Sequence, residues 1–391
     1  MSTVELPKGW KLVRFGDVAE SIMERVDDPS KAGVERYVGL EHLDSDTTVI
    51  RRWGKPEDVE ATKLRFYPGD VIYARRRAYQ RKLGVADFEG ICSAHALVLR
   101  ARTSTCVPEF LPYFLQGDAF HRRALDISVG SLSPTINWKT LAVQEFALPP
   151  LDEQRRIADV LRAADEVVEG LRLVQERMLL TLAAFGAAVA TGGVAKSDLT
   201  TVADLVEEDR PVTYGILKPG VGFPGGVPVI KVKDYPSGYI QTEDLLLTSP
   251  EIDSDYKRSR LRKGDLLISI RGTIGRTAEV PLELAGANIT QDTARLTIRR
   301  DHDRRYIRHM LDSRFVQEQI EQRISGLAVK GINIGALRQV LVPTPPHSVQ
   351  RELAERFELI ETVLNIEREH MENTRNLRAS LLEQLLGGPR E

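Results

Sequence analysis

The chain has 391 residues and a formal net charge of −2, with 42% hydrophobic and 28% charged residues. This balance is typical of a soluble globular protein of two or three domains, and it excludes a protein whose whole surface is basic. Any contact with nucleic acid must therefore come from local patches. Two cysteines without CxxC spacing favour the reducing cytoplasm, and we expect no membrane span because no sufficiently long apolar run occurs.

The first half of the chain predicts a mixed α/β domain that ends in a long helix. Extended segments are expected at 36–40, 65–75 and 94–100, with turns between them. Two amphipathic helices follow at 108–118 and 119–126, and then a loop of small residues at 128–137. Pro149-Pro150 then precedes a helix, with Asp152 as the expected N-cap. Apolar residues recur in it at heptad-like spacing, at Ile157, Ala164, Leu171, Met178 and Phe185.

The second half repeats the first, with a period of about 190 residues. Val202-Ala203-Asp204-Leu205 echoes Phe15-Gly16-Asp17-Val18, and 261–271 matches 65–75, each a Gly-Asp turn before a strand that ends on Arg271 or Arg75. Pro345-Pro346 opens a second long helix, with Ser348 as its expected N-cap and Gly387-Gly388-Pro389 as its stop signal.

Two similar helices, each closing a similar segment, predict an antiparallel pair. At about 1.5 Å per residue each would be a rod of roughly 50 Å. We therefore expect an α+β protein with an internal pseudo-twofold repeat: mixed α/β domains at 1–150 and 197–346, and coiled-coil helices at 151–190 and 347–388. For either helix taken alone, the heptad-like row of apolar residues has a simpler explanation, which is a core helix packed on its own domain.

Signatures of catalysis and metal binding are missing from the sequence. The Gly-rich stretch 220–226 lacks the lysine of a phosphate loop, and none of the seven histidines has metal-ligand spacing. The acidic stretch 56–63 superficially resembles a nuclease site, but its spacing is wrong and the second half has no counterpart. We expect no catalytic residue, no metal and no cofactor in this chain.

Both halves carry a basic window at the same stage of the repeat. Residues 63–82 and 257–276 each hold seven Lys or Arg against one Asp, a net charge of +6. A solvated face is the ordinary interpretation of one such window, but recurrence favours phosphate binding, with arginine also able to grip guanine. The candidate DNA-binding residues are Arg75, Arg76, Arg77, Tyr79, Gln80, Arg81, Lys82 and Ser131 in the first half, and Lys257, Arg258, Arg271, Thr273, Arg276, Gln291 and Lys330 in the second.

Several of these candidates have an equally simple structural explanation. Tyr79 and Gln80 fit an ordinary exposed loop as well as a base-reading one. Ser131, Ser133, Ser325 and Lys330 lie in loops whose small residues would allow close approach to a phosphate, and a plain turn explains each serine equally well.

The order of these motifs resembles one known family, the specificity (S) subunits of type I restriction-modification systems. The resemblance covers essentially the whole chain and depends on Leu6-Pro7-Lys8-Gly9-Trp10, the duplicated Gly-Asp strand, Leu148-Pro149-Pro150-Leu151-Asp152-Glu153-Gln154 and Val329-Lys330-Gly331-Ile332-Asn333. It implies two target recognition domains that read the two parts of a split site in double-stranded DNA, joined by conserved spacer helices.

The resemblance also implies the partners. Two methyltransferase subunits would dock on the helices and hold S-adenosylmethionine, and a motor-nuclease (restriction) subunit can join such complexes. Exposed helix residues such as Arg155, Arg162, Glu169 and Glu358 would face the partners or solvent. The competing hypothesis is a scaffold protein that holds two protein partners and binds no DNA; it gives no reason for the two basic windows.

Overall fold

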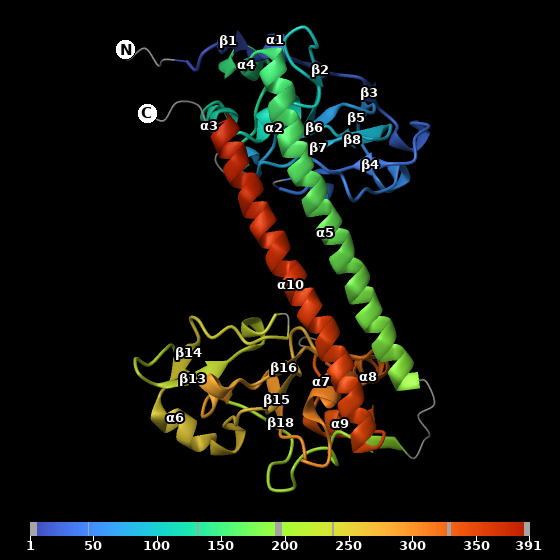
Figure 1. Cartoon of the computed structure of the whole chain (residues 1–391), viewed down its shortest axis with the longest axis vertical. Coiled ribbons are helices and arrows are strands. Elements are labelled where there is room, and N and C mark those ends of the chain that lie inside the picture. Colours follow the sequence, from blue (N-terminus) through green and yellow to red (C-terminus); the bar gives the residue numbers. More distant parts are fainter. Residues whose placement is uncertain are drawn as a thin grey trace. The chain divides into compact units, whose positions relative to one another are not determined.

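The computed structural model describes residues 6–45, 47–130, 133–191, 198–236, 238–326 and 330–386. The chain divides into two compact units (Figure 1). Unit 1 comprises Met1–Leu173 and Arg368–Glu391, and unit 2 comprises Val174–Glu367. Each unit therefore contains one copy of the repeat together with a segment of each long helix.

Unit 1 contains two four-stranded sheets, a terminal two-stranded sheet and four short helices. The first sheet is antiparallel, in the order β2 (Ala19–Ile22), β9 (Ala96–Ala101), β6 (Val71–Ala74), β7 (Leu83–Val85). The second has the order β3 (Arg25–Val26), β5 (Lys63–Phe66), β8 (Gly90–Ser93), β4 (Tyr37–Val38). The other elements are β1 (Lys11–Arg14), β10 (Glu145–Leu148), α1 (Phe15–Val18), α2 (Leu111–Gln116), α3 (Asp118–Asp126) and α4 (Trp138–Ala142).

Unit 2 repeats this plan with fewer strands in its second sheet. Its antiparallel sheet has the order β12 (Thr213–Tyr214), β18 (Thr293–Leu296), β15 (Leu266–Ser269), β16 (Thr277–Glu279). The three-stranded sheet has the order β14 (Leu246–Thr248), β13 (Val227–Ile230), β17 (Asn288–Ile289). The other elements are β11 (Leu199–Thr201), β19 (Leu341–Pro343), α6 (Pro250–Asp255), α7 (Arg304–Asp312), α8 (Arg314–Glu321) and α9 (Ile334–Arg338).

The strand register corrects one detail of the predicted repeat. On β6, Val71 lies opposite Val85 and Leu99, and on β15, Leu266 lies opposite Glu279 and Leu296. Since these two ladders correspond, Val71 is equivalent to Leu266. Counting on from them places Arg76, rather than Arg75, at the position of Arg271.

The repeated Gly-Asp turn is a structural device. Gly69 and Gly264 have φ angles of +91° and +83°, a left-handed conformation that favours glycine. Asp70 is buried and accepts hydrogen bonds from the Tyr67 amide at 2.9 Å and from Arg100 Nε at 2.8 Å. Asp265 is likewise buried and bonds to the Arg262 amide at 2.7 Å. The turn residue is therefore an aspartate because it caps the backbone ahead of the strand.

A small sheet closes each copy of the repeat next to a long helix. β1 pairs with β10 in unit 1, and β11 pairs with β19 in unit 2. The following helices begin at Leu151 and His347, so Asp152 and Ser348 lie inside the first turn, and the N-cap prediction was wrong. Gln154 is buried, and its side chain accepts a hydrogen bond from the Val107 amide at 2.8 Å. The side chain of Gln350 likewise accepts a hydrogen bond from the Asp303 amide at 3.0 Å.

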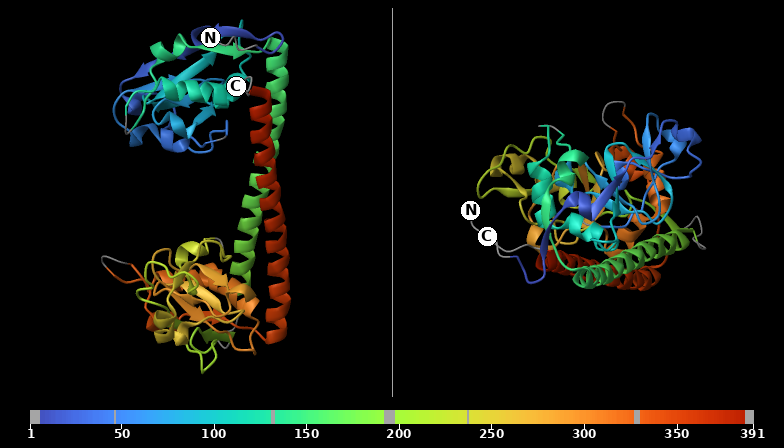
Figure 2. Two further views of the ribbon diagram at one scale, coloured as in Figure 1. Left: turned by 90° about the vertical axis from the view of Figure 1, so that its left-hand side faces the viewer. Right: turned by 90° about the horizontal axis from the view of Figure 1, so that it is seen from above.

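The two long helices, α5 (Leu151–Thr191) and α10 (His347–Leu386), lie side by side within each unit (Figures 1 and 2). In unit 1 the beginning of α5 shares a core with the end of α10, through Ile157, Leu161 and Leu386. In unit 2 the end of α5 packs against the beginning of α10, with the Phe185 and Phe357 ring centroids 4.7 Å apart. The antiparallel pairing is therefore confirmed, while the stop signal at Gly387–Pro389 lies outside the described residues.

By length and apolar composition alone, α5 is the one helix of the described residues that could cross a membrane. Such a helix on its own is weak evidence for a span, since core helices of soluble proteins pass the same test. Part of its apolar surface is used in packing, because Ile157 and Leu161 belong to the core of unit 1 and Ala190 to the core of unit 2, whereas Leu180 between them is exposed.

Candidate nucleic-acid interface

In unit 1 an exposed arginine lies where the basic window crosses a hairpin loop. Residues 75–77 leave strand β6 and run beside residues 133–136, with the Ile136 amide donating to the Arg75 carbonyl at 3.0 Å. Arg76 forms an isolated bridge with Thr135, and its Nε donates to Ser133 Oγ at 2.9 Å. The exposed side chain of Arg76 is therefore held at the surface by a hydrogen bond from its guanidinium group to the neighbouring loop.

Unit 2 builds the same crossing with a different anchor. The Ile332 amide donates to the Ile270 carbonyl at 3.0 Å, and Arg271 forms the bridge with Gly331. Arg271 Nη1 donates to Gln291 Oε1 at 3.0 Å. A side chain at Gly331 would place its Cβ only 3.2 Å from Arg271 Cγ, so glycine permits the arginine to lie across the loop. The predicted Arg271 and Gln291 are thus brought together.

Backbone strain marks the loop that follows Arg76. Arg77 has a φ of +58° and Arg81 a φ of +50°, on either side of the 3-10 turn Ala78–Gln80. A left-handed conformation costs a non-glycine residue about 1–2 kcal/mol, and such residues cluster at functional sites. The position equivalent to Arg77 in unit 2 is Gly272, with a φ of +71°. The exposed side chains of Arg77 and Tyr79 stand on this strained loop.

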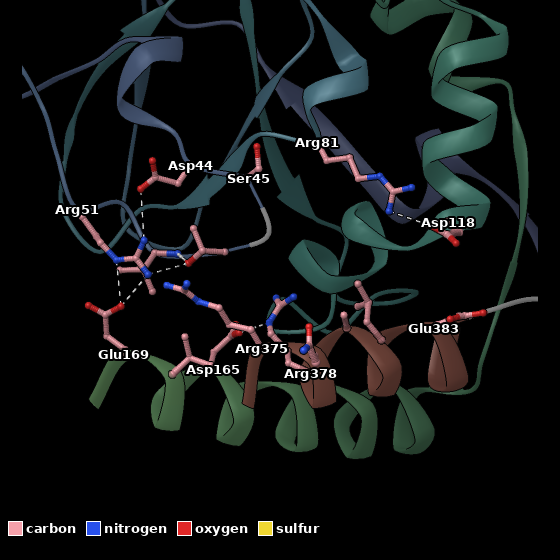
Figure 3. Close-up of a pocket in the computed structure, with 16 residues that line it drawn as sticks. Asp44, Ser45, Arg51, Arg81, Asp118, Asp165, Glu169, Arg375, Arg378 and Glu383 are labelled. Carbon is pink, nitrogen blue, oxygen red and sulfur yellow. Dashed lines mark hydrogen bonds and ion pairs between the residues drawn. The ribbon is translucent and has the colours of Figure 1, made fainter. Parts of the chain in front are cut away.

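The remaining candidates of the first window turn toward the protein. Arg75 Nη2 donates to the Ala94 carbonyl at 2.9 Å, and Lys82 Nζ donates to the Leu40 carbonyl at 3.4 Å. Arg81 pairs with Asp118 at 2.8 Å across a cavity that also contains Arg378 and Asp165 (Figure 3). Gln80 is half-buried, and its backbone carbonyl accepts a hydrogen bond from Ser45 Oγ at 2.8 Å. These contacts leave Arg76, Arg77 and Tyr79 as the outward-facing members.

The second window is more dispersed along the fold. Lys257 and Arg258 are exposed on a 3-10 turn at Lys257–Ser259, and no hydrogen bond between described residues joins them to Arg271. Arg276 is half-buried and donates from Nη1 to the Val232 carbonyl at 3.3 Å. Thr273 and Lys330 are exposed, whereas Ser131 lies outside the described residues.

One residue near the interface was missed from the sequence. His95 follows the end of β8, and its ring is close enough to Arg75 and Arg76 for their charges to act on it. Burial first, and then these two guanidinium groups, lower the pKa of His95 below its usual value of 6.5, so the ring is neutral near pH 7. A single histidine without a repeated partner gives no sequence pattern that would have singled it out.

The arrangement can bind an anion or a nucleic acid. Exposed guanidinium groups with free N–H donors suit phosphate oxygens and the O6 and N7 acceptors of guanine. Among the described residues, no group of three or more His, Cys, Asp and Glu side chains is placed to hold a metal ion. Cys92 and Cys106 are both fully buried, and burial raises the pKa of each thiol, as expected for small core residues.

Comparison with known proteins gives one consistent family. Residues 7–172 match the family model of the type I restriction modification DNA specificity domain. The chain is 28% identical over 275 residues to the type I restriction enzyme EcoBI specificity subunit of Escherichia coli, covering 63% of this chain and 56% of that protein. It is 27% identical over 168 residues to the EcoDI specificity subunit of the same organism, covering 41% and 37%. Both alignments span less than two thirds of those relatives.

The fold extends this likeness over the whole chain. The S subunit of the type I restriction-modification system from M. genitalium superposes with a TM-score of 0.59 and 14% identity, covering 99% of each chain. At that identity the superposition shows the fold alone. The family model and the two relatives carry the assignment: residues 7–172 form a type I restriction modification DNA specificity domain, and the chain is similar to type I specificity subunits.

Proposed function

We propose that this chain is the sequence-reading subunit of a type I restriction-modification complex and binds a split target in double-stranded DNA. Each unit reads one part of the target through the loop crossing that carries Arg76 or Arg271. Phosphate contacts from the basic windows position each unit, and side chains at the crossing read base edges. The lengths of α5 and α10 set the spacing between the two parts.

One observation carries this proposal. The same topological position in both units, two residues beyond the strand end, holds an exposed arginine beside a hairpin loop. The anchors differ, because Ser133 holds Arg76 and Gln291 holds Arg271. A shared position supports a shared role, and different anchors support two different half-sequences. A protein-binding scaffold gives no reason for this duplicated arginine.

The partners in this proposal are two methyltransferase subunits, with a motor-nuclease subunit joining them in the restricting complex. S-adenosylmethionine and the catalytic groups belong to those partners, and the assembly works in the cytoplasm. Exposed apolar side chains on both helices, among them Leu180 at 66% and Leu359 at 67% exposure, support docking there. Arg155 and Arg162 are exposed, whereas Glu169 and Glu358 are only partly exposed and pair with Arg51 at 2.7 Å and with Arg305 at 2.8 Å. That these four residues face partner subunits stays a prediction.

The deciding experiment is to express the chain with a cognate methyltransferase subunit and map the methylated positions in the host genome. We expect one motif made of two specified parts separated by an unspecified gap, and no motif when the chain is omitted. Binding should also weaken steeply as salt increases, since phosphate contacts release counterions. Methylation that is unchanged without the chain, or DNA binding insensitive to salt, would contradict the proposal.

A further inference from the structure

A small cavity of about 180 Å³ opens beside Arg271 in unit 2. Its deepest residues are apolar, since Ile270 is 4% exposed and Ile332 is 3% exposed. Leu217 forms an outer wall and is 49% exposed. The full lining consists of Tyr214, Leu217, Ile270, Arg271, Gln291, Ile332, Asn333 and Ile334.

The polar side chains of this cavity have defined positions. Gln291 Oε1 fixes the guanidinium of Arg271 at 3.0 Å, so the cation stands at the cavity in one orientation. Asn333 Oδ1 accepts a hydrogen bond from the Ala336 amide at 2.8 Å and thus caps α9. The cavity wall thus combines the apolar side chains of Leu217, Ile270, Ile332 and Ile334 with the charge of Arg271.

This combination of groups selects among the parts of DNA. A phosphate would bring a hydrated anion against Ile270, Ile332 and Leu217, which offer it no hydrogen bond. In the major groove only thymine presents an apolar group, its C5 methyl, beside hydrogen-bonding base edges. The cavity is larger than a methyl group and can take the methyl-bearing edge of a pyrimidine.

Building on the proposed function, we propose that this cavity is a subsite for the C5 methyl group of a thymine in the half-site read by unit 2. Arg271 contacts the phosphate or base next to that thymine, while Leu217 closes over the methyl group from the solvent side. The cavity, rather than the arginine, then distinguishes thymine from cytosine and uracil at this position.

Unit 1 has different residues at the corresponding places. Trp138 begins α4 where Ile334 begins α9, and its ring packs edge-on against Phe15 at 5.9 Å. The strand register also places Arg75 at the position of Ile270, and Ala94 at the position of Gln291. The inference therefore applies to unit 2 alone and predicts a thymine methyl requirement in one half-site.

The test uses the complex of this chain with its methyltransferase subunits and duplexes of the mapped target. Each thymidine is replaced singly by deoxyuridine, which removes only the methyl group. We expect one replacement, in the half-site whose reading is lost in Arg271→Ala, to weaken binding about fourfold, the value of one buried carbon. Leu217→Ala should abolish this difference between thymine and uracil. Leu282→Ala, at an exposed leucine outside the cavity, should retain it.

Three outcomes would overturn the inference: a half-site without thymine on either strand, equal binding of every uracil duplex, or a methyl effect that persists in Leu217→Ala. Each of these leaves specific binding of the target intact. Failure of the proposed function would look different, because the complex would then show no sequence preference for any duplex.

Discussion

Arg378 of α10 donates a hydrogen bond from Nη2 to Oε1 of Gln116 on α2, at 2.6 Å. Its Nε also pairs with Asp165 of α5, so one buried guanidinium joins both long helices to the mixed α/β part of unit 1 (Figure 3). Asp165 Oδ2 accepts further hydrogen bonds from the Tyr113 hydroxyl at 3.1 Å and from Thr48 Oγ1 at 3.2 Å. Counted from the start of its helix, Leu182 of α5 stands at the position that Arg378 holds in α10.

Replacing Arg378 by leucine should lower the free energy of unfolding by about 3–5 kcal/mol, because the carboxylate of Asp165 would remain buried without its cation. The measurement is urea unfolding of the chain, followed by circular dichroism. Arg375→Leu is the matched control, since Arg375 is exposed on the same helix. The double variant Asp165→Leu with Arg378→Leu should lose less than Arg378→Leu alone, and an equal or larger loss would show that the ion pair is not the cause.

Arg76→Ala and Arg271→Ala should each affect only one half of the DNA target. A well-placed bidentate arginine contributes about 1–3 kcal/mol of discrimination between bases, so each variant should relax one half-sequence by about fivefold or more. Competition binding with duplexes mutated in either half-site measures this. Arg65→Ala is a suitable control, because Arg65 is tied to Glu89 and to the Ala32 carbonyl. Relaxation of both half-sites by a single variant would argue against two independent readers.

Arg77→Gly should stabilise the protein while weakening DNA binding. Glycine relieves the left-handed backbone at φ +58°, which should raise the free energy of unfolding by up to about 1 kcal/mol. Ala61→Gly, at φ +60° in the same unit, should stabilise by a similar amount and leave DNA affinity unchanged. Unfolding curves and salt titrations of DNA binding test the pair. Unchanged DNA affinity in Arg77→Gly would show that Arg77 does not contribute to DNA binding.

His309 should make unit 2 sensitive to acid. Burial lowers the pKa of His309 to about 3, with a smaller contribution from the Arg308 charge, and its ring stacks on Phe357 at 4.3 Å. Below about pH 6.5 the imidazole of His309 gains a proton in the unfolded chain, whereas in the folded chain it stays neutral until the pH approaches 3. The contribution of His309 to the free energy of unfolding is therefore complete above pH 6.5. It is lost as the pH falls from there toward 3, by about 2 kcal/mol at pH 5.

The comparison that isolates this effect is between the chain and His309→Tyr, which copies Tyr113 at the same place in unit 1. The variant should lose about 2 kcal/mol less than the chain between pH 7 and pH 5 in chemical unfolding. His370→Tyr, at an exposed ring on α10, should leave the pH slope unchanged. If the free energy of unfolding depended on pH equally in the chain and in His309→Tyr, the pKa of His309 would not be lowered in the folded protein.

The sequence by itself determined the repeat, the two long helices and their antiparallel pairing. These features follow from local chemistry that is written twice: Gly69-Asp70 and Gly264-Asp265 set the same turn, and each prolyl pair ends an extended segment before a helix. The heptad-like row of apolar residues in 151–190 needs a partner helix to bury it, and the sequence has only one other row of that length, in 347–388. Gln154 belonged to the recognised motif, but its hydrogen bond to the Val107 amide, and that of Gln350 to the Asp303 amide, appear only in the structure.

Only the tertiary structure decided which members of the basic windows face outward. Charge counting treats Arg76 and Arg81 alike, whereas the fold turns Arg81 to Asp118 and leaves Arg76 at the surface. The equivalence of Arg76 with Arg271 also required the ladder, since a shift of one residue along a strand reverses the face of every side chain. The partners of Arg378 are more than 200 positions away in the sequence, and such contacts leave no local pattern.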